Sequence, residues 1–124
     1  MKFYICPHCG NIINHFRDSG VRVVCCGTEM QELVPGTSDG ATEKHVPVVK
    51  VEGNKATVTV SSVEHPMVEA HFINWIVLET MHGFQKKELK PGEKPEAEFL
   101  LAEGDTAVAA YEYCNLHGLW KAEI

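Results

Sequence analysis

Five residues of two types could form one site for redox chemistry, although they lie far apart in the sequence. Cys114 and His117 flank Asn115 and Leu116 in a predicted turn near the C-terminus. Three more histidines lie upstream, at predicted strand edges or within a strand: His45, His65 and His71. One thiolate with several imidazoles is typical of a redox-active transition metal more than of structural zinc. Taken singly, each histidine also fits an ordinary core or surface position, so the pattern alone leaves both interpretations open.

The N-terminal segment carries a second cluster, in which the ligands are cysteines. Cys6 and Cys9 have the two-residue spacing of a metal knuckle, and Cys25 and Cys26 follow at a distance typical of a four-thiolate site. Adjacent side chains diverge on an extended backbone, so Cys25 and Cys26 can reach one metal only if the backbone bends. The segment is too short to fold on an apolar core alone, so we expect the metal to supply much of its folding energy. The spacing leaves iron and zinc both open.

Composition narrows the function classes. The chain has 124 residues, a net charge of -6 and five cysteines, an odd number that a disulfide framework would leave unpaired. Metal ligation accounts for all five thiols, and reduced thiols indicate the cytoplasm. The acidic balance disfavours nucleic-acid binding, and no apolar run approaches the roughly 20 residues of a membrane helix. The N-terminus also lacks the apolar stretch of a signal peptide.

The elements that position these residues are predicted to be β-strands. Residues 35–40 form a linker by composition, and we place a domain boundary there, with domains 1–36 and 37–124. Seven short strands follow, predicted over residues 46–52, 55–60, 68–80, 83–89, 96–102, 106–113 and 119–123. The run 68–80 forms one long strand or two short ones. It contains His71, six residues after His65, a spacing that keeps both on one face of a regular strand unless Pro66 interrupts it. Seven strands with regular turns indicate a mostly β protein with a β-sandwich.

Five motifs in this order resemble desulfoferrodoxin, the two-iron form of superoxide reductase, over essentially the whole chain. They are the four N-terminal cysteines, Glu43-Lys44-His45-Val46-Pro47, His65-Pro66-Met67, His71, and Cys114-Asn115-Leu116-His117-Gly118. The resemblance implies a desulforedoxin-like metal knuckle followed by an immunoglobulin-like β-sandwich. It implies two iron ions per chain, with reduction of superoxide to hydrogen peroxide at the second iron and without dismutation. It also implies a homodimer and an electron donor protein such as rubredoxin.

The resemblance also assigns the site residues. Four cysteines would hold a ferric ion: Cys6, Cys9, Cys25 and Cys26. Four histidines and one axial cysteine would hold an iron that alternates between ferrous and ferric: His45, His65, His71, His117 and Cys114. Lys44 would attract superoxide, since an acidic chain repels this anion unless a local positive charge steers it. Glu43 would close the open position on ferric iron.

Three other functions fit the sequence less well than this interpretation. A zinc-ribbon interaction protein leaves the adjacent Cys25 and Cys26 and the lone Cys114 unexplained. A rubredoxin-type electron carrier accounts for residues 1–35 and leaves the histidines without a role. Superoxide dismutase must also oxidise superoxide, for which an electron-rich, thiolate-ligated iron is a poor oxidant.

Overall fold

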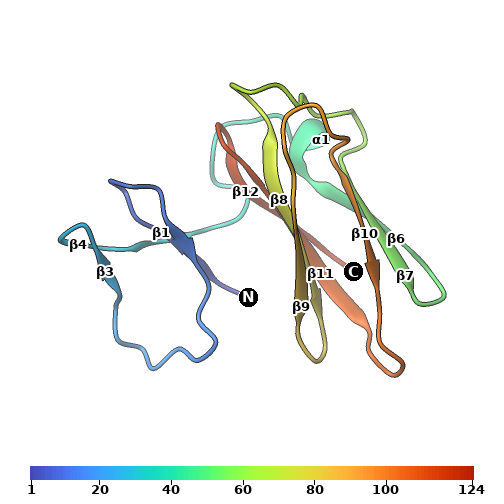
Figure 1. Ribbon diagram of the computed structural model, residues 1–124, viewed down its shortest axis with the longest axis horizontal. Coiled ribbons are helices and arrows are strands. Elements are labelled where there is room, and N and C mark those ends of the chain that lie inside the picture. The colour runs from blue at the N-terminus through green and yellow to red at the C-terminus, as the bar shows by residue number, and fades with distance from the viewer. The chain divides into compact units, whose positions relative to one another are not determined.

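The computed structural model describes all residues, 1–124, and divides them into two compact units (Figure 1). The N-terminal unit is Met1–Val34 and the C-terminal unit is Pro35–Ile124, a division two residues before the predicted boundary. No helix of the structure is long and apolar enough to cross a membrane.

The N-terminal unit consists of very short strands. Strands β1 (Phe3–Ile5), β2 (Ile12–Ile13) and β5 (Gln31–Leu33) form a sheet in the order β2-β1-β5, and β3 (Val24–Cys25) pairs with β4 (Thr28–Glu29). Its buried apolar residues are only Phe3, Cys6 and Met30. So small a core supports the expectation that a bound metal stabilises this unit.

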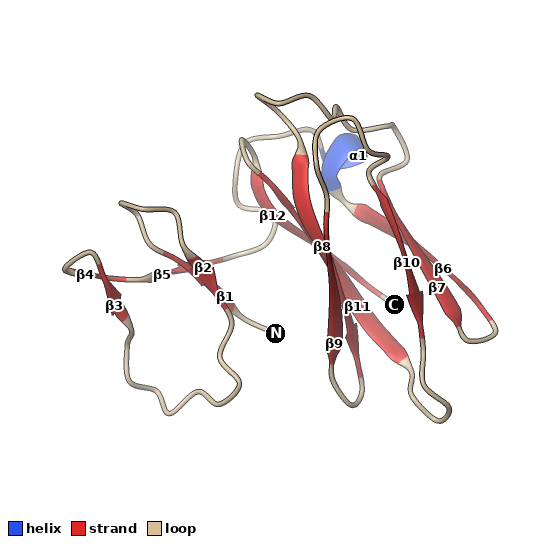
Figure 2. Cartoon of the chain, in the orientation of Figure 1, coloured by secondary structure: helices blue, strands red, loops and turns tan.

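The C-terminal unit is a sandwich of two antiparallel sheets, as Figure 2 shows. One sheet has the order β10-β7-β6, and the other has the order β12-β11-β8-β9. The strand bounds are β6 Pro47–Glu52, β7 Lys55–Val60, β8 Ile73–Thr80, β9 Phe84–Glu88, β10 Glu96–Leu100, β11 Ala107–Cys114 and β12 Gly118–Glu123. The seven predicted strands are therefore confirmed, and three-plus-four sheets with these connections are immunoglobulin-like.

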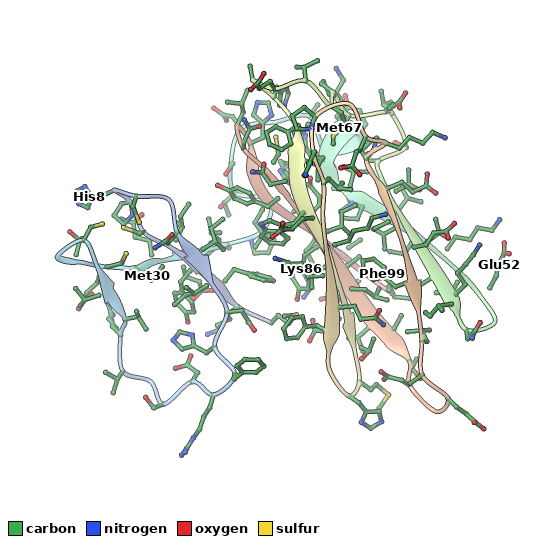
Figure 3. The ribbon with its side chains drawn as sticks, viewed as in Figure 1. His8, Met30, Glu52, Met67, Lys86 and Phe99 are labelled. Atoms are coloured by element: carbon green, nitrogen blue, oxygen red, sulfur yellow. The ribbon has the colours of Figure 1, made fainter.

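The core of the sandwich follows from alternation along the strands. Ala56, Val58 and Val60 of β7 are all fully buried, whereas the residues between them are partly exposed. Phe99 of β10 belongs to the same core cluster and is marked in Figure 3. Because successive side chains in a strand point to opposite faces, one face of each sheet supplies the core. The strands therefore build the core, and the loops at the ends of the sandwich can carry side chains with other roles.

Two local features differ from the sequence prediction. Residues Thr42–His45 form a short helix, α1, directly before β6. The run 68–80 contains a single strand that begins only at Ile73, so His71 lies outside it. His71 instead forms an isolated bridge with Val68. A common face for His65 and His71 required a regular strand through both residues, and the turn after Pro66 interrupts it.

Candidate metal centres

The five candidate residues of the C-terminal unit come together at one point. The ligand atoms of His45, His65, His71, Cys114 and His117 all lie within 4.8 Å of one another. They come from α1, from the segment between β7 and β8, from the end of β11 and from the β11–β12 turn. Figure 1 shows α1 and that turn at the same end of the sandwich. Met67, labelled in Figure 3, lies at this end as well and packs against the core.

Helix α1 is anchored from the segment that follows β7. The hydroxyls of Ser61 and Ser62 and the backbone N–H of Val63 all donate hydrogen bonds to the carbonyl oxygen of Glu43. His45, at the end of α1, is thereby brought to 2% exposure, the same fraction as His65. Four residues cannot form a stable helix alone, so α1 depends on these contacts.

Asn115 ties the cysteine turn to the segment that carries His71. Its side-chain oxygen accepts a hydrogen bond from the N–H of Phe72 at 3.0 Å, and its side-chain amide donates to the carbonyl of Ala70 at 3.0 Å. Its backbone N–H donates to the carbonyl of Phe72 at 3.2 Å. The sequence places Asn115 in a predicted turn beside Cys114. The structure adds that it fixes the distance between Cys114 and His71.

The four imidazole rings form a closed cycle. Neighbouring rings lie 4.6–4.9 Å apart between centroids, in the order His45, His65, His71, His117 and back to His45. Each ring is steeply inclined to the next, with interplanar angles of 76–88°. The Sγ atom of Cys114 lies 3.9 Å from Nδ1 of His117. Four ring nitrogens and one sulfur therefore converge on a common centre.

The donor atoms fit a cation. The Nδ1 atoms of His45 and His65 lie 2.8 and 2.7 Å from the carbonyl oxygens of Ala41 and Pro66, so each Nδ1 carries the proton. Their Nε2 atoms then present lone pairs, yet they face each other at 3.2 Å. The Nε2 atom of His71 is also buried, without a hydrogen-bond partner. Lone pairs held together in this way are accounted for by a metal ion between them.

The protonation states of these groups favour metal binding. Burial lowers the pKa of His45 and His71, and lowers that of His65 to about 4, so the imidazoles are neutral at pH 7. Burial raises the pKa of the Cys114 thiol, while the backbone N–H groups of Leu116 and His117 act in the opposite direction. The thiolate therefore needs a cation beside it, and metal binding would release the proton.

The N-terminal unit holds the second cluster. The sulfur atoms of Cys6, Cys9, Cys25 and Cys26 lie within 4.8 Å of one another, and all are free thiols. The adjacent pair meets the others because Cys26 has a left-handed backbone with a φ of 52°, followed by Gly27 at 73°. Two such residues form the tight turn of a β-hairpin between β3 and β4. This is the bend that the sequence required.

Backbone amides support this cluster. The N–H groups of His8 and Cys9 each donate to Sγ of Cys6 at 3.4 Å. The N–H of Cys9 is the main cause that lowers the pKa of Cys6 to about 6. Hydrogen bonding with Cys9 is in turn the main cause that raises the pKa of Cys25 and that of Cys26, the latter to about 12. Four thiols that compete for protons in this way become compatible as thiolates when a metal ion neutralises them.

Three histidines lie outside both clusters. His8 is exposed at the tip of its unit (Figure 3) and contacts the Thr28 hydroxyl at 3.1 Å. His82 is exposed. His15 is half-buried, with its ring edge-on to Tyr4 at 5.1 Å. Its burial arises because Tyr4 offers an aromatic surface that the strand pattern did not reveal.

Glu43 and Lys44 lie on α1, and both are exposed to solvent. Burial is the main cause that lowers the pKa of His45 and His71, but the positive charge of Lys44 acts on both in the same direction. The ammonium is therefore close enough to influence the imidazole cycle electrostatically.

Two residues near the cycle were missed by sequence reasoning. Trp120 is 5% exposed and stacks on His45. Glu112 is completely buried, and neither of its carboxylate oxygens has a hydrogen-bond partner. A charged residue at an inward position of the alternating β11 pattern was a usable signal for Glu112. The tryptophan had no such signal, because an apolar residue in a strand is expected in the core.

The chain is similar to known proteins in sequence and in fold. A family model described as desulfoferrodoxin matches residues 37–123. A desulfoferrodoxin from Nitratidesulfovibrio vulgaris is 53% identical over 122 residues, which cover 98% of this chain and 95% of that protein. A superoxide reductase from Pyrococcus abyssi is 31% identical over 106 residues, which cover 71% of this chain and 91% of that protein. The crystal structure of the superoxide reductase from Treponema pallidum matches with a TM-score of 0.82 at 38% identity and covers 98% of each chain.

The match to the Nitratidesulfovibrio protein extends over nearly the full length of both chains, and the family model covers most of the C-terminal unit. Together with the two ligand clusters, these similarities establish that the chain belongs to the desulfoferrodoxin family.

Proposed function

We propose that this protein is a superoxide reductase, which converts superoxide to hydrogen peroxide with one electron and two protons and does not dismute it. The observation that carries the proposal is the convergence of four imidazoles and one thiol within 4.8 Å. A relative from Pyrococcus abyssi and the matching structure from Treponema pallidum are both named superoxide reductases.

We assign two iron sites. His45, His65, His71, His117 and Cys114 hold the reactive iron, and Cys6, Cys9, Cys25 and Cys26 hold the other. When bound at the first site, iron supplies the single electron that superoxide accepts. The chain contributes three neutral imidazoles with lowered pKa and a thiol whose proton is displaced on binding. A thiolate among imidazoles favours a redox-active metal.

Lys44 is proposed to attract the substrate. The chain carries a net charge of -6 and therefore repels superoxide at long range. Two unit charges in water interact by about 1 kcal/mol at 4 Å, and physiological salt screens them beyond about 8 Å. Only a cation close to the site can offset the repulsion, and the influence of Lys44 on His45 and His71 supports it in that role.

Glu43 is proposed as the second catalytic residue. Its backbone is fixed by the Ser61 and Ser62 hydroxyls, while its side chain is exposed. A carboxylate is a hard ligand, and ferric iron binds such ligands more strongly than ferrous iron does. We propose that Glu43 would close the open position on the ferric iron once superoxide has been reduced. We also propose that Lys44 orders the water that delivers protons to that position.

The N-terminal unit is proposed to be a desulforedoxin-like iron domain, with the domains spanning 1–36 and 37–124. We propose that an external electron carrier such as rubredoxin reduces the protein, that the protein is a homodimer and that it acts in the cytoplasm. Five free thiols support a reducing compartment. The N-terminal iron is proposed to stabilise its unit and to contribute only secondarily to electron transfer.

Product stoichiometry tests the activity. Iron-loaded, reduced protein should yield one hydrogen peroxide for each superoxide consumed, with one electron drawn from the reductant and no dioxygen released. A dismutase would release one dioxygen for every hydrogen peroxide and consume no reductant. Simultaneous recording of peroxide, dioxygen and oxidised donor distinguishes the two. Dioxygen release in step with peroxide would reject the proposal, and so would an iron-loaded protein that leaves superoxide unchanged.

A further inference from the structure

We propose that Trp120 is a positioning residue of the four-histidine, one-cysteine site, whose indole holds two of the four imidazoles, His45 and His117, in the geometry that binds iron. The inference rests on the proposed function only in requiring that this cluster binds iron. It does not depend on what the iron then reacts with.

Trp120 contacts both histidines at once. Its ring stacks on that of His45, with centroids 5.0 Å apart and an interplanar angle of 26°. Its Nε1–H donates a hydrogen bond to the carbonyl oxygen of His117 at 3.0 Å. The two histidines are 72 positions apart in the chain, yet their ring nitrogens Nε2 and Nδ1 lie 3.0 Å apart. A single side chain therefore links the end of α1 to the β11–β12 turn.

The indole N–H supplies a restraint that His117 otherwise lacks. The rings of His45 and His65 are each oriented by an Nδ1 hydrogen bond to a backbone carbonyl. The His117 ring faces the cluster with Nδ1 instead and has no such carbonyl partner. Its direction depends on the backbone of the turn, and this backbone is held by Trp120. Groups of this kind, which orient a ligand without touching the metal, commonly alter metal affinity 10- to 100-fold when removed.

Gly40 packs tightly against the same group. A Cβ atom at this position would lie 3.1 Å from Cε1 of His45, 3.2 Å from Cβ of His117 and 3.2 Å from Cζ2 of Trp120. Glycine is required here by this close approach and not by its backbone angle. Any side chain would push on the two histidines or on the indole, so Gly40→Ala perturbs the same geometry without altering Trp120.

The test separates the two contacts of the indole. Trp120→Phe keeps a six-membered aromatic ring that can stack on His45, and it removes the N–H group together with the rest of the indole's five-membered ring. The control is Trp75→Phe, which alters the chain's other tryptophan, stacked on Tyr113 at 5.7 Å and 13°. Iron release to a chelator, the ferric thiolate charge-transfer band and the ferric electron paramagnetic resonance spectrum are recorded for each protein. The four-cysteine site, in the other unit, serves as an internal reference in every sample.

We expect Trp120→Phe to release the histidine-bound iron about 10-fold faster and to shift both ferric spectra, with the four-cysteine iron unchanged. Trp75→Phe should match the unaltered protein. Gly40→Ala should reproduce the spectral shift, and it decides the question if the tryptophan variant fails to fold. Unchanged spectra and iron release in Trp120→Phe and Gly40→Ala would overturn the proposal. If the unaltered, iron-loaded protein does not reduce superoxide, the proposed function is rejected and this inference is unaffected.

Discussion

Glu112 provides the sharpest prediction about stability, because it is a buried carboxyl without a partner. On β11 it is paired with Ile76 of β8 and Trp120 of β12, and neither residue offers a side-chain hydrogen bond to it. Burial raises the pKa of Glu112 from 4.5 to about 9. The carboxyl is therefore protonated in the folded protein at pH 7 and ionised in the unfolded chain.

The sign of the pH dependence follows from that difference. A folded-state pKa above the unfolded value means that the folded protein binds the proton more tightly. The stabilisation that the folded protein gains from this tighter proton binding is complete below pH 4.5 and is lost as the pH rises toward about 9. The slope is about 1.4 kcal/mol per pH unit, so the group should lower the free energy of unfolding by about 2.7 kcal/mol between pH 6 and pH 8.

Glu112→Gln should remove this slope. The amide carries its own burial penalty, but that penalty does not change with pH and cancels when the two pH values are compared. The difference in Tm between variant and unaltered protein should therefore increase from pH 6 to pH 8. At about 4–8 °C per kcal/mol for a unit of this size, the increase is roughly 10–20 °C. Contributions from the histidines are common to both proteins and cancel as well.

The assay is thermal unfolding of the iron-loaded proteins at pH 6, 7 and 8. Glu103→Gln makes the same chemical change at an exposed turn position and should leave the pH dependence as it was. If the Tm difference for Glu112→Gln is the same at pH 6 and pH 8, Glu112 is not kept protonated by burial. The reasoning from its isolation in the core would then be refuted.

Three further predictions concern the two sites. Lys44→Ala should slow the reaction with superoxide and flatten its ionic-strength dependence at unchanged iron content, whereas Lys50→Ala, which alters an exposed lysine paired with Glu52 at 2.8 Å, should do neither. An unaltered rate in Lys44→Ala would contradict the steering role. Cys114→Ser should abolish the thiolate-to-ferric charge-transfer band, as an absorption spectrum of the oxidised protein would reveal; persistence of the band would mean that another residue supplies the sulfur. Cys9→Ser should remove the N-terminal iron, measured as a fall from two irons per chain to one. It should also lower the thermal stability of that unit, since only three thiolates remain to hold that metal. Superoxide reduction by the pre-reduced protein should stay within about twofold. A large loss of activity would identify the N-terminal iron as an obligate relay.

The electrostatic arrangement explains why the cluster favours a bound cation. Burial keeps His45, His65 and His71 neutral, and two of them are locked with Nδ1 toward carbonyl oxygens. Lone pairs are consequently forced toward one centre together with a thiol. In the metal-free state these ligand atoms repel one another, and metal binding relieves that repulsion.

Much of this architecture was accessible from sequence because its causes are local. Alternation at period two predicts strands, and turn residues between them predict a sandwich. The pair Cys25-Cys26 required a bent backbone, and the left-handed φ of Cys26 provides it. Each of these features depends on a few neighbouring residues, whose chemistry limits the local conformation.

Other features depend on partners that are distant in sequence, and pattern reasoning failed there. His71 was expected inside a strand, but the turn after Pro66 places it before β8. Helix α1 was not predicted, because four residues have no periodicity and the helix is held by hydroxyls from the segment after β7. Sequence showed which five side chains could bind a metal, since their types determine the chemistry. Only the tertiary structure determined that they share one centre, that Trp120 and Gly40 pack against two of them, and that Glu112 is buried alone, because these facts arise from packing between segments far apart in the chain.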